Sequence, residues 1–144
     1  MDNNVVEIRT FIKRPIGEVW GKYTLPEHIV NWNHASDDWH TPSAENDLRP
    51  GGVFSYRMAA RDGSFEFDFS GVYDEVIINR NISYTLDDGK KVFVYFIEEN
   101  DGVEVIIRFE AESSNSKEMQ KAGWQAILDN FNKYVSSTWD IIKT

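Results

Sequence analysis

The last long stretch of the chain, Ser116–Ile142, has the hydrophobic pattern of an amphipathic helix. It contains no proline, and no glycine follows Gly123. Its large apolar residues recur at spacings of three and four, which places them in one stripe along an α-helix. That stripe consists of Trp124, Ile127, Leu128, Phe131, Tyr134 and Val135. With Asn115 or Ser116 as the N-terminal cap, the pattern predicts one long helix whose aromatic face needs a partner.

The beginning of the chain predicts one strand and two short helices. Val5–Ile12 is rich in β-branched residues and alternates in polarity, as a strand does. Pro15 ends this strand and suits the first turn of a helix, so we expect a helix over Pro15–Tyr23. The segment Thr24–Glu27 then has the spacing of a capping box, which predicts a second helix over Pro26–Trp32.

The next segment, Asn33–Asp47, is polar and lacks a clear period. We expect an irregular loop here, with one edge strand near Ser43–Asp47 at most. The run Leu48–Gly52 follows and predicts a turn, because proline presets φ and glycine permits positive φ.

From Val53 onward apolar residues recur with a period of two, interrupted by Asp-Gly pairs. Asp-Gly between alternating runs is a strong signal for a hairpin, and three such pairs occur here. The pattern predicts an antiparallel meander of consecutive strands. These strands are Val53–Ala60, Phe65–Ile77, Ile82–Leu86, Val92–Glu98 and Val103–Ala111.

The order of these elements predicts an α+β fold. An antiparallel sheet must hide one face and the long helix must hide its stripe, so each is the natural partner of the other. We therefore expect a curved antiparallel sheet of about six to seven strands, wrapped around the C-terminal helix. Two short helices follow the first strand. No linker or repeat divides the chain, so residues 1–144 are expected to form one domain.

Five short motifs occur along this layout. They are Pro15-Ile16-Gly17-Glu18-Val19-Trp20; Thr24-Leu25-Pro26-Glu27 followed by Trp32; Leu48-Arg49-Pro50-Gly51-Gly52-Val53-Phe54; Gly71-Val72-Tyr73-Asp74-Glu75-Val76; and Gly123-Trp124 with Leu128-Asp129-Asn130-Phe131. In their order they resemble the helix-grip (START/Bet v 1-like, SRPBCC) superfamily, which includes the START domains and the birch-pollen allergen. Within it, the chain is similar to the family of the Hsp90-ATPase-activator homologues over essentially its whole length.

This resemblance implies the helix-grip fold with a cavity between sheet and helix. It implies little about activity, because relatives range from lipid carriers to cyclases and many are lone domains without an established role. The co-chaperone that gives the family its name carries a separate N-terminal domain, for which this chain has no room. We therefore do not expect it to activate Hsp90.

Charge and composition exclude several classes of partner. The chain has 24 acidic and 15 basic residues, a net charge of −9, whereas nucleic acids and anionic membranes attract basic surfaces. We expect neither as a partner. No apolar run approaches the roughly 20 residues of a membrane span, and the N-terminus lacks a signal-peptide pattern. We expect a cytoplasmic monomer or weak dimer, and a protein partner remains open.

No cofactor, metal site or catalytic residue is predicted. The chain has no cysteine, which excludes thiolate chemistry. His28, His34 and His40 lie close in sequence but lack the spacing of metal ligands. No nucleophile elbow, phosphate-binding loop or dinucleotide fingerprint occurs. Glu75 shares parity with the inward residues Phe69, Gly71 and Tyr73, but a bulge would reverse that face, so both orientations stay open.

The aromatic residues are the positive signal. Those on the inward faces should converge between sheet and helix, where a cavity of this fold would bind an apolar molecule. The candidate ligand-binding residues are Trp32 and Trp39 near the mouth, Phe54, Tyr56, Phe67, Phe69 and Tyr73 on the sheet, and Trp124, Leu128 and Phe131 on the helix. The candidate polar anchors are Tyr56, Tyr73, Tyr84, Arg57 and His34. The alternative is that the aromatic side chains fill the interior completely.

Three functions stay open from the sequence. Binding of a small apolar or aromatic ligand is favoured, a protein-interaction role comes second and catalysis third. A protein-interaction or co-chaperone-like role would be supported by an exposed apolar patch of several hundred Å². A cyclase or hydratase would be supported by a buried carboxylate or histidine with a shifted pKa.

Overall fold

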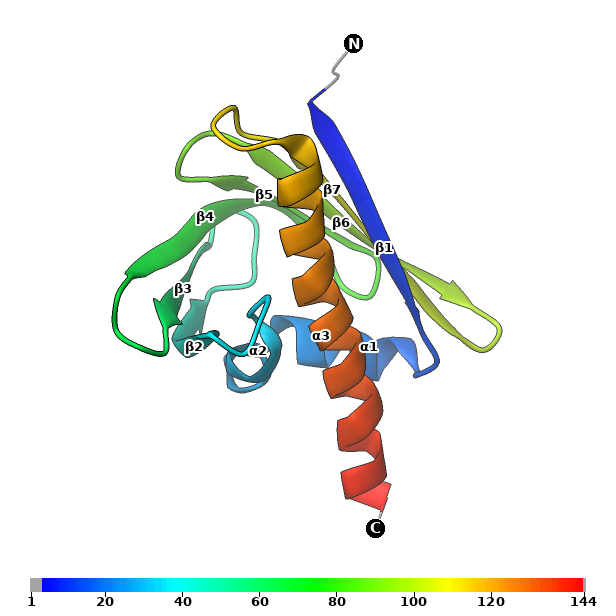
Figure 1. Cartoon of the computed structure of the whole chain (residues 1–144). Coiled ribbons are helices and arrows are strands. Elements are labelled where there is room, and N and C mark those ends of the chain that lie inside the picture. Colours follow the sequence, from blue (N-terminus) through cyan, green and yellow to red (C-terminus); the bar gives the residue numbers. More distant parts are fainter. Residues whose placement is uncertain (1–3, 144) are drawn as a thin grey trace.

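The computed structural model describes residues 4–143, and it confirms the α+β architecture (Figure 1). The elements are β1 (Val5–Ile12), α1 (Ile16–Thr24), α2 (Pro26–Trp32), β2 (Trp39–Asn46), β3 (Val53–Ala60), β4 (Glu66–Ile77), β5 (Asn81–Leu86), β6 (Lys91–Glu99), β7 (Gly102–Glu110) and α3 (Lys117–Lys143).

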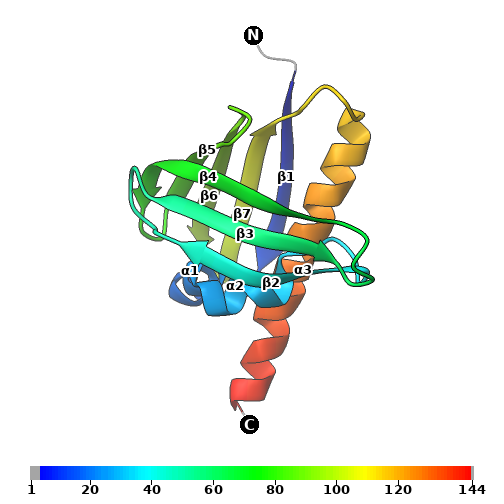
Figure 2. The same cartoon turned by 90° about the vertical axis from the view of Figure 1, so that its left-hand side faces the viewer.

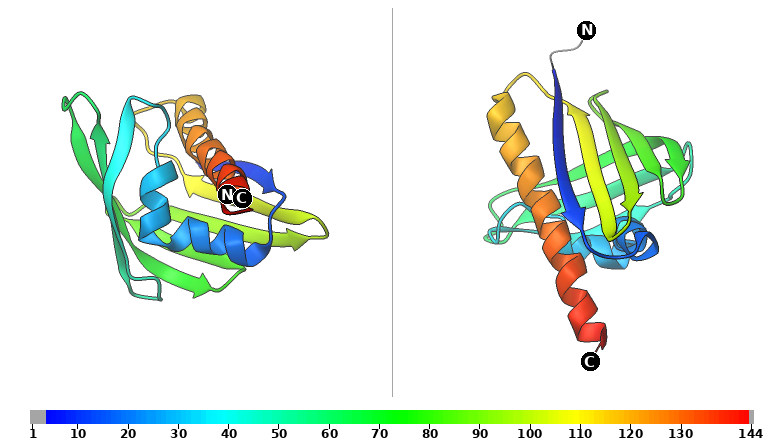
Figure 3. Two further views of the ribbon diagram at one scale, coloured as in Figure 1. Left: turned by 90° about the horizontal axis from the view of Figure 1, so that it is seen from below. Right: turned by 90° about the vertical axis from the view of Figure 1, so that its right-hand side faces the viewer.

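All seven strands form one antiparallel sheet in the order β1-β7-β6-β5-β4-β3-β2. Strands β2 to β7 are a meander of neighbours, as the repeated turn signals predict, and β1 completes the sheet beside β7. The sheet curls, and α3 lies across its hollow side next to β1 (Figures 1 and 2). Helices α1 and α2 cover one end of the space between them (Figure 3).

The Asp-Gly pairs serve two different purposes. Gly63 and Gly89 have φ values of 79° and 88°, so these two glycines supply the left-handed conformation that their turns require. Gly102 is not among the positive-φ residues. A Cβ atom there would stand 2.4 Å from the carbonyl oxygen of Ile12, so glycine at this position permits β1 to approach β7.

Strand β2 corrects the predicted loop over Asn33–Asp47. The strand is longer than expected, and it pairs with β3 from Trp39 onward. The pairing shifts between His40 and Ser43, around Pro42. Proline cannot donate a ladder hydrogen bond and is tolerated on edge strands, which is why a polar segment that contains it still forms a strand here.

The predicted capping box at the start of α2 is wrong. Leu25 is the N-cap, and no side chain caps the helix. The Thr24 hydroxyl instead donates to the carbonyl oxygen of Trp20 at 2.8 Å, inside α1. Pro26 occupies the first turn of α2, where its missing N–H costs nothing. Its fixed φ therefore replaces the side-chain cap.

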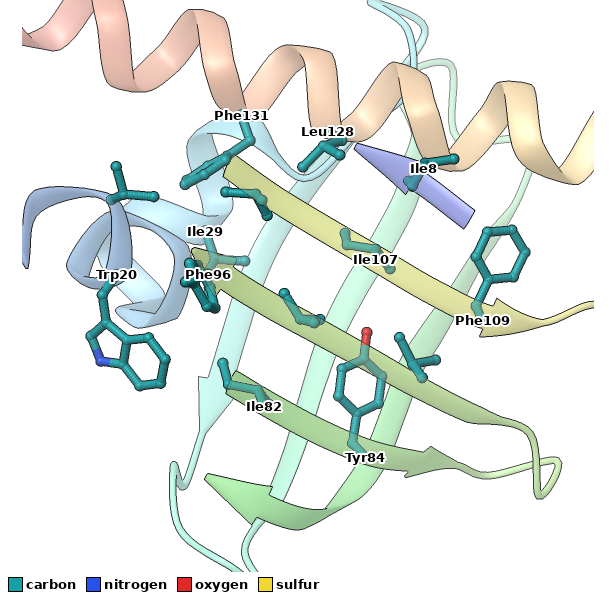
Figure 4. Packing of buried hydrophobic residues seen from close by; sticks show 14 of the residues in the cluster. Ile8, Trp20, Ile29, Ile82, Tyr84, Phe96, Ile107, Phe109, Leu128 and Phe131 are labelled. Atoms are coloured by element: carbon teal, nitrogen blue, oxygen red, sulfur yellow. The ribbon is translucent and has the colours of Figure 1, made fainter. Parts of the chain in front are cut away.

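The long helix α3 is built as its pattern predicts. The Ser116 hydroxyl accepts from the backbone N–H of Met119 at 3.1 Å and so caps the helix. Leu128, Phe131 and Val135 are all at most 2% exposed. They pack onto the inward residues of the sheet, such as Ile107 (Figure 4).

A bulge in β4 decides the orientation of Glu75. The pairing with β5 shifts between Tyr73 and Glu75, which reverses the faces of the residues that follow. Tyr73 is buried, whereas Glu75 is exposed and accepts a hydrogen bond from Asn81 at 2.7 Å. No carboxylate enters the interior from this strand.

Candidate ligand-binding cavity

A cavity of about 230 Å³ lies between the sheet and α3, so the aromatic side chains do not fill the interior. It is lined by Tyr23 and Thr24 from α1, Trp32 and Asn33 at the end of α2, Tyr56 and Met58 from β3, Phe67, Phe69 and Tyr73 from β4, Ile82 and Tyr84 from β5, Ile107 from β7, and Trp124, Ile127 and Leu128 from α3.

The floor of the cavity rests on Phe54, which is 1% exposed. Its ring centroid lies 5.2 Å from that of Tyr73 and 4.8 Å from that of Tyr84. Phe54 can sit this low because Gly71 lies opposite it on β4. A Cβ atom on Gly71 would stand 3.1 Å from the Phe54 ring and 2.5 Å from the Thr85 carbonyl oxygen.

The helical wall is held by aromatic stacking and hydrogen bonds. Trp124 stacks on Phe109 with a centroid distance of 4.2 Å and an angle of 11° between the planes. The Trp32 indole N–H donates to the carbonyl oxygen of Lys22 at 2.9 Å, and its ring stacks on Tyr23 at 5.2 Å. These contacts fix two of the largest lining rings in place.

Two polar contacts hold α2 and the segment after it against α3. Nδ1 of His28 and the hydroxyl oxygen of Tyr134 are 2.6 Å apart. The Asn130 amide donates to the carbonyl oxygen of His34 at 2.5 Å. The cover at this end of the cavity is therefore attached to the long helix through side chains.

Seven of the ten predicted ligand-binding residues line the cavity. They are Trp32, Tyr56, Phe67, Phe69, Tyr73, Trp124 and Leu128. Phe54 and Phe131 lie behind the lining in the core. Trp39 lies outside it, with ring centroids 6.1 Å from Phe65 and 6.1 Å from Phe67. Contact of these residues with a ligand stays a prediction.

Two of the predicted polar anchors do not reach the cavity. The Arg57 guanidinium forms ion pairs with Glu66 and Asp68, each at 3.0 Å, on the outer face of the sheet. His34 is absent from the lining. Its Nδ1 is buried without a hydrogen-bond partner among the described residues, and burial, assisted by the positive charge of Arg61, lowers the pKa of its imidazole.

The other three anchors, Tyr56, Tyr73 and Tyr84, do line the cavity. Burial raises the pKa of Tyr73 to about 12 and that of Tyr56 well above its usual value. The Tyr56 hydroxyl is hydrogen-bonded to that of Tyr73. Tyr73 then donates to Oδ1 of Asn46 at 2.5 Å, and the Asn46 amide donates to the carbonyl oxygen of Thr24 at 2.7 Å.

Sequence patterns missed Tyr23 and Asn33 as lining residues. Tyr23 is the last member of the apolar stripe of α1, a position that predicts burial but no particular neighbour. Burial raises the pKa of its hydroxyl well above the usual value. Asn33 follows α2 and donates to Sδ of Met58 at 3.1 Å. Only the packing of α1 and α2 under α3 places these two side chains at the cavity.

The lining contains no Asp, Glu, His, Lys or Arg side chain from the part of the chain that the structure describes. Among the described side chains of residues 4–137, no three potential metal ligands come together. Within the same range, no helix is both long and apolar enough to cross a lipid bilayer. The cavity is thus a neutral, mostly aromatic space with phenol, amide and hydroxyl groups.

Comparison with known proteins identifies the family. Residues 13–136 match the family described as activator of Hsp90 ATPase homolog 1-like protein. The chain belongs to this family. The match spans α1 through most of α3, so it includes every element that lines the cavity.

Solved structures of this family have the same fold. The chain is 42% identical to an AHSA1-like protein from Aeromonas hydrophila, with a TM-score of 0.88 and 93% of each chain covered. It is 41% identical to a protein from Cytophaga hutchinsonii, with a TM-score of 0.82 and 96% of each chain covered. A protein from Nitrosomonas europaea has the same TM-score of 0.82 at 17% identity, over 97% of this chain and 99% of that one, which is a likeness of fold alone. No curated protein matches the chain.

Proposed function

We propose that this protein binds a small, largely apolar molecule in the cavity between the sheet and α3. The observation that carries this proposal is the neutral, mostly aromatic space of about 230 Å³ between the sheet and α3. Cores normally leave few voids larger than a water molecule. A void of this size, lined by rings and a few polar groups, has the composition of a small-molecule site.

The volume limits the ligand. An apolar cavity of about 150 Å³ holds one benzene molecule, so this cavity has room for roughly ten non-hydrogen atoms, such as one ring with a short chain. A ligand that buries ~300 Å² gains about 7 kcal/mol at roughly 25 cal/mol per Å². Once the costs of association are subtracted, micromolar affinity is the upper limit.

The mouth lies near the tips of β2 and β4. Phe67 lines the cavity and is also 40% exposed, so this side chain borders both the cavity and solvent. Trp39 and Phe65 pack beside it, and Phe65 is 58% exposed. Rearrangement of these three rings would open a path to the interior without disturbing the buried core.

A fragment screen with NMR shift mapping tests the proposal. Uncharged aromatic fragments of about ten non-hydrogen atoms should perturb the backbone signals of Tyr84, Ile107 and Leu128. The variant Ile127→Phe adds volume to the cavity wall and should weaken every hit, whereas Ile97→Phe makes the same change on the exposed outer face of β6. Fragments that bind the Ile127→Phe variant as tightly as the unmodified protein would refute binding in the cavity. So would fragments whose chemical-shift changes map to the outer face of the sheet.

A protein contact is the second candidate. Val53 and Val72 pair across β3 and β4 and are 56% and 43% exposed, so this apolar pair on the outer face of the sheet is the candidate contact. Sedimentation velocity at rising protein concentration tests whether two copies meet there. Association that Val72→Asp abolishes would support this role. A species that stays monomeric throughout would count against self-association.

The cyclase or hydratase alternative has no comparable support. Its condition is a buried carboxylate or histidine with a shifted pKa. Burial lowers the pKa of His34, but His34 lies outside the lining, and the described lining contains no carboxylate or histidine. The ionisable lining groups are tyrosines whose pKa values are raised. Such phenols stay protonated near neutral pH and act as hydrogen-bond donors.

A further inference from the structure

Tyr84 presents a hydroxyl to the cavity that no other group among the described residues uses. Its residue is 8% exposed, and its oxygen points from β5 into the space beneath α3 (Figure 4). Among the side chains described, those of residues 4–137, no hydrogen bond joins this hydroxyl to another protein group, in contrast to Tyr73, which donates to Asn46. The hydroxyl therefore borders the open space of the cavity, where an acceptor atom of a ligand would pair with it.

Tyr23 adds a second donor from the opposite side. Its side chain lies on α1, faces the same cavity, and likewise has no hydrogen-bond partner within the described residues. A charge on Tyr23 would raise the pKa of Tyr84, as expected for two phenols that line one cavity. The cavity therefore offers two uncommitted phenol donors in one region.

We propose that the cavity selects an uncharged apolar molecule with a carbonyl oxygen, which accepts hydrogen bonds from Tyr84 and Tyr23. This inference rests on the proposed function, because it assigns the chemical class of that ligand. A carbonyl oxygen has two lone pairs and can accept from two donors at once. The aromatic remainder of the ligand would lie against Trp124, Phe69 and Leu128.

The lining also disfavours ligands of either charge. A carboxylate that enters the cavity loses its hydration and finds no arginine, lysine or histidine in the described lining. An ammonium group meets no carboxylate. Burial of an unpaired charge costs far more than burial of a neutral polar group, so charged analogues of the same size should bind much more weakly.

Three probes of matched shape test this assignment in the full-length protein. Propiophenone carries a carbonyl group next to its ring, propylbenzene lacks it, and 3-phenylpropanoate has a carboxylate in place of the terminal methyl group of propylbenzene. Titrations followed by NMR should give a dissociation constant for propiophenone about tenfold lower than for propylbenzene, the usual effect of one satisfied buried donor. 3-Phenylpropanoate should bind most weakly of the three.

Single-atom variants assign the effect to the two hydroxyls. Tyr84→Phe and Tyr23→Phe should each reduce the preference for propiophenone several-fold and leave propylbenzene affinity within about twofold. Tyr95→Phe removes a hydroxyl from the outer face of β6 and should change neither. Propylbenzene binding also confirms that each variant keeps its cavity.

The outcomes separate this inference from the function it rests on. Equal affinity for propiophenone and propylbenzene in the unmodified protein would overturn the carbonyl assignment and leave the cavity as an unselective apolar site. A preference that survives both tyrosine substitutions would overturn the role of these hydroxyls. Failure of all three probes to bind the interior would overturn the proposed function itself.

Discussion

Replacing Phe131 with alanine tests the packing of α3 on the sheet. Phe131 is fully buried, and its ring centroid lies 4.8 Å from Trp32 and 5.1 Å from Tyr23. Burial of a phenylalanine side chain is worth about 1.5–3 kcal/mol, and each aromatic pair adds about 0.5–1.5 kcal/mol. The sum agrees with the ~3–5 kcal/mol measured for buried Phe→Ala changes, so we expect a loss in this range.

Urea unfolding followed by circular dichroism measures this loss as a change in the free energy of unfolding. Asp129→Ala is the control, because Asp129 lies two residues away on the exposed side of α3, where its carboxylate accepts from Gln125 at 3.0 Å. We expect Asp129→Ala to change stability by less than about 0.5 kcal/mol. Equal losses from the two substitutions would refute the assignment of the buried face.

Three further predictions follow from the cavity and its surroundings. Gly71→Ala should destabilise the fold by roughly 1–3 kcal/mol in the same urea assay, because the new Cβ would meet the Thr85 carbonyl oxygen at 2.5 Å; unchanged stability would contradict this contact. Unfolded tyrosine ionises near pH 10 whereas folded Tyr73 has a pKa of about 12, so stability should fall as pH rises from ~10 to ~12 and fall less steeply in Tyr73→Phe; parallel curves would argue against burial of this phenol. Elemental analysis of chelator-free protein should find no stoichiometric zinc, iron, nickel or copper; a full equivalent lost in a His34→Ala, His40→Ala double variant would overturn the prediction.

The regular elements could be predicted because their hydrophobic periods are strong. The stripe of α3 and the alternation of β3 each match one face of a real element. Strand β2 could not be predicted in the same way, because its sequence around Pro42 lacks alternation. Its strand conformation comes from the ladder with β3, which is a long-range contact.

Which inward-pointing side chains border the cavity was harder to predict than which face of a helix or strand points inward. Period-two and helical patterns indicate that Phe54 and Phe131 point inward, and both do, but they lie behind the cavity instead of lining it. Whether an inward ring borders a void depends on how rings from several elements pack together. Tyr23 reaches the cavity for the same reason, through the placement of α1 under α3.

The most direct test of the account is an isotope-filtered NOE experiment on the protein with bound propylbenzene. We predict intermolecular NOEs from the probe to the methyl groups of Leu128, Ile107 and Ile82, which line the cavity from α3, β7 and β5. NOEs confined to exposed outer residues such as Val72 and Ile97 would contradict the account, because the probe would then sit on the surface of the sheet.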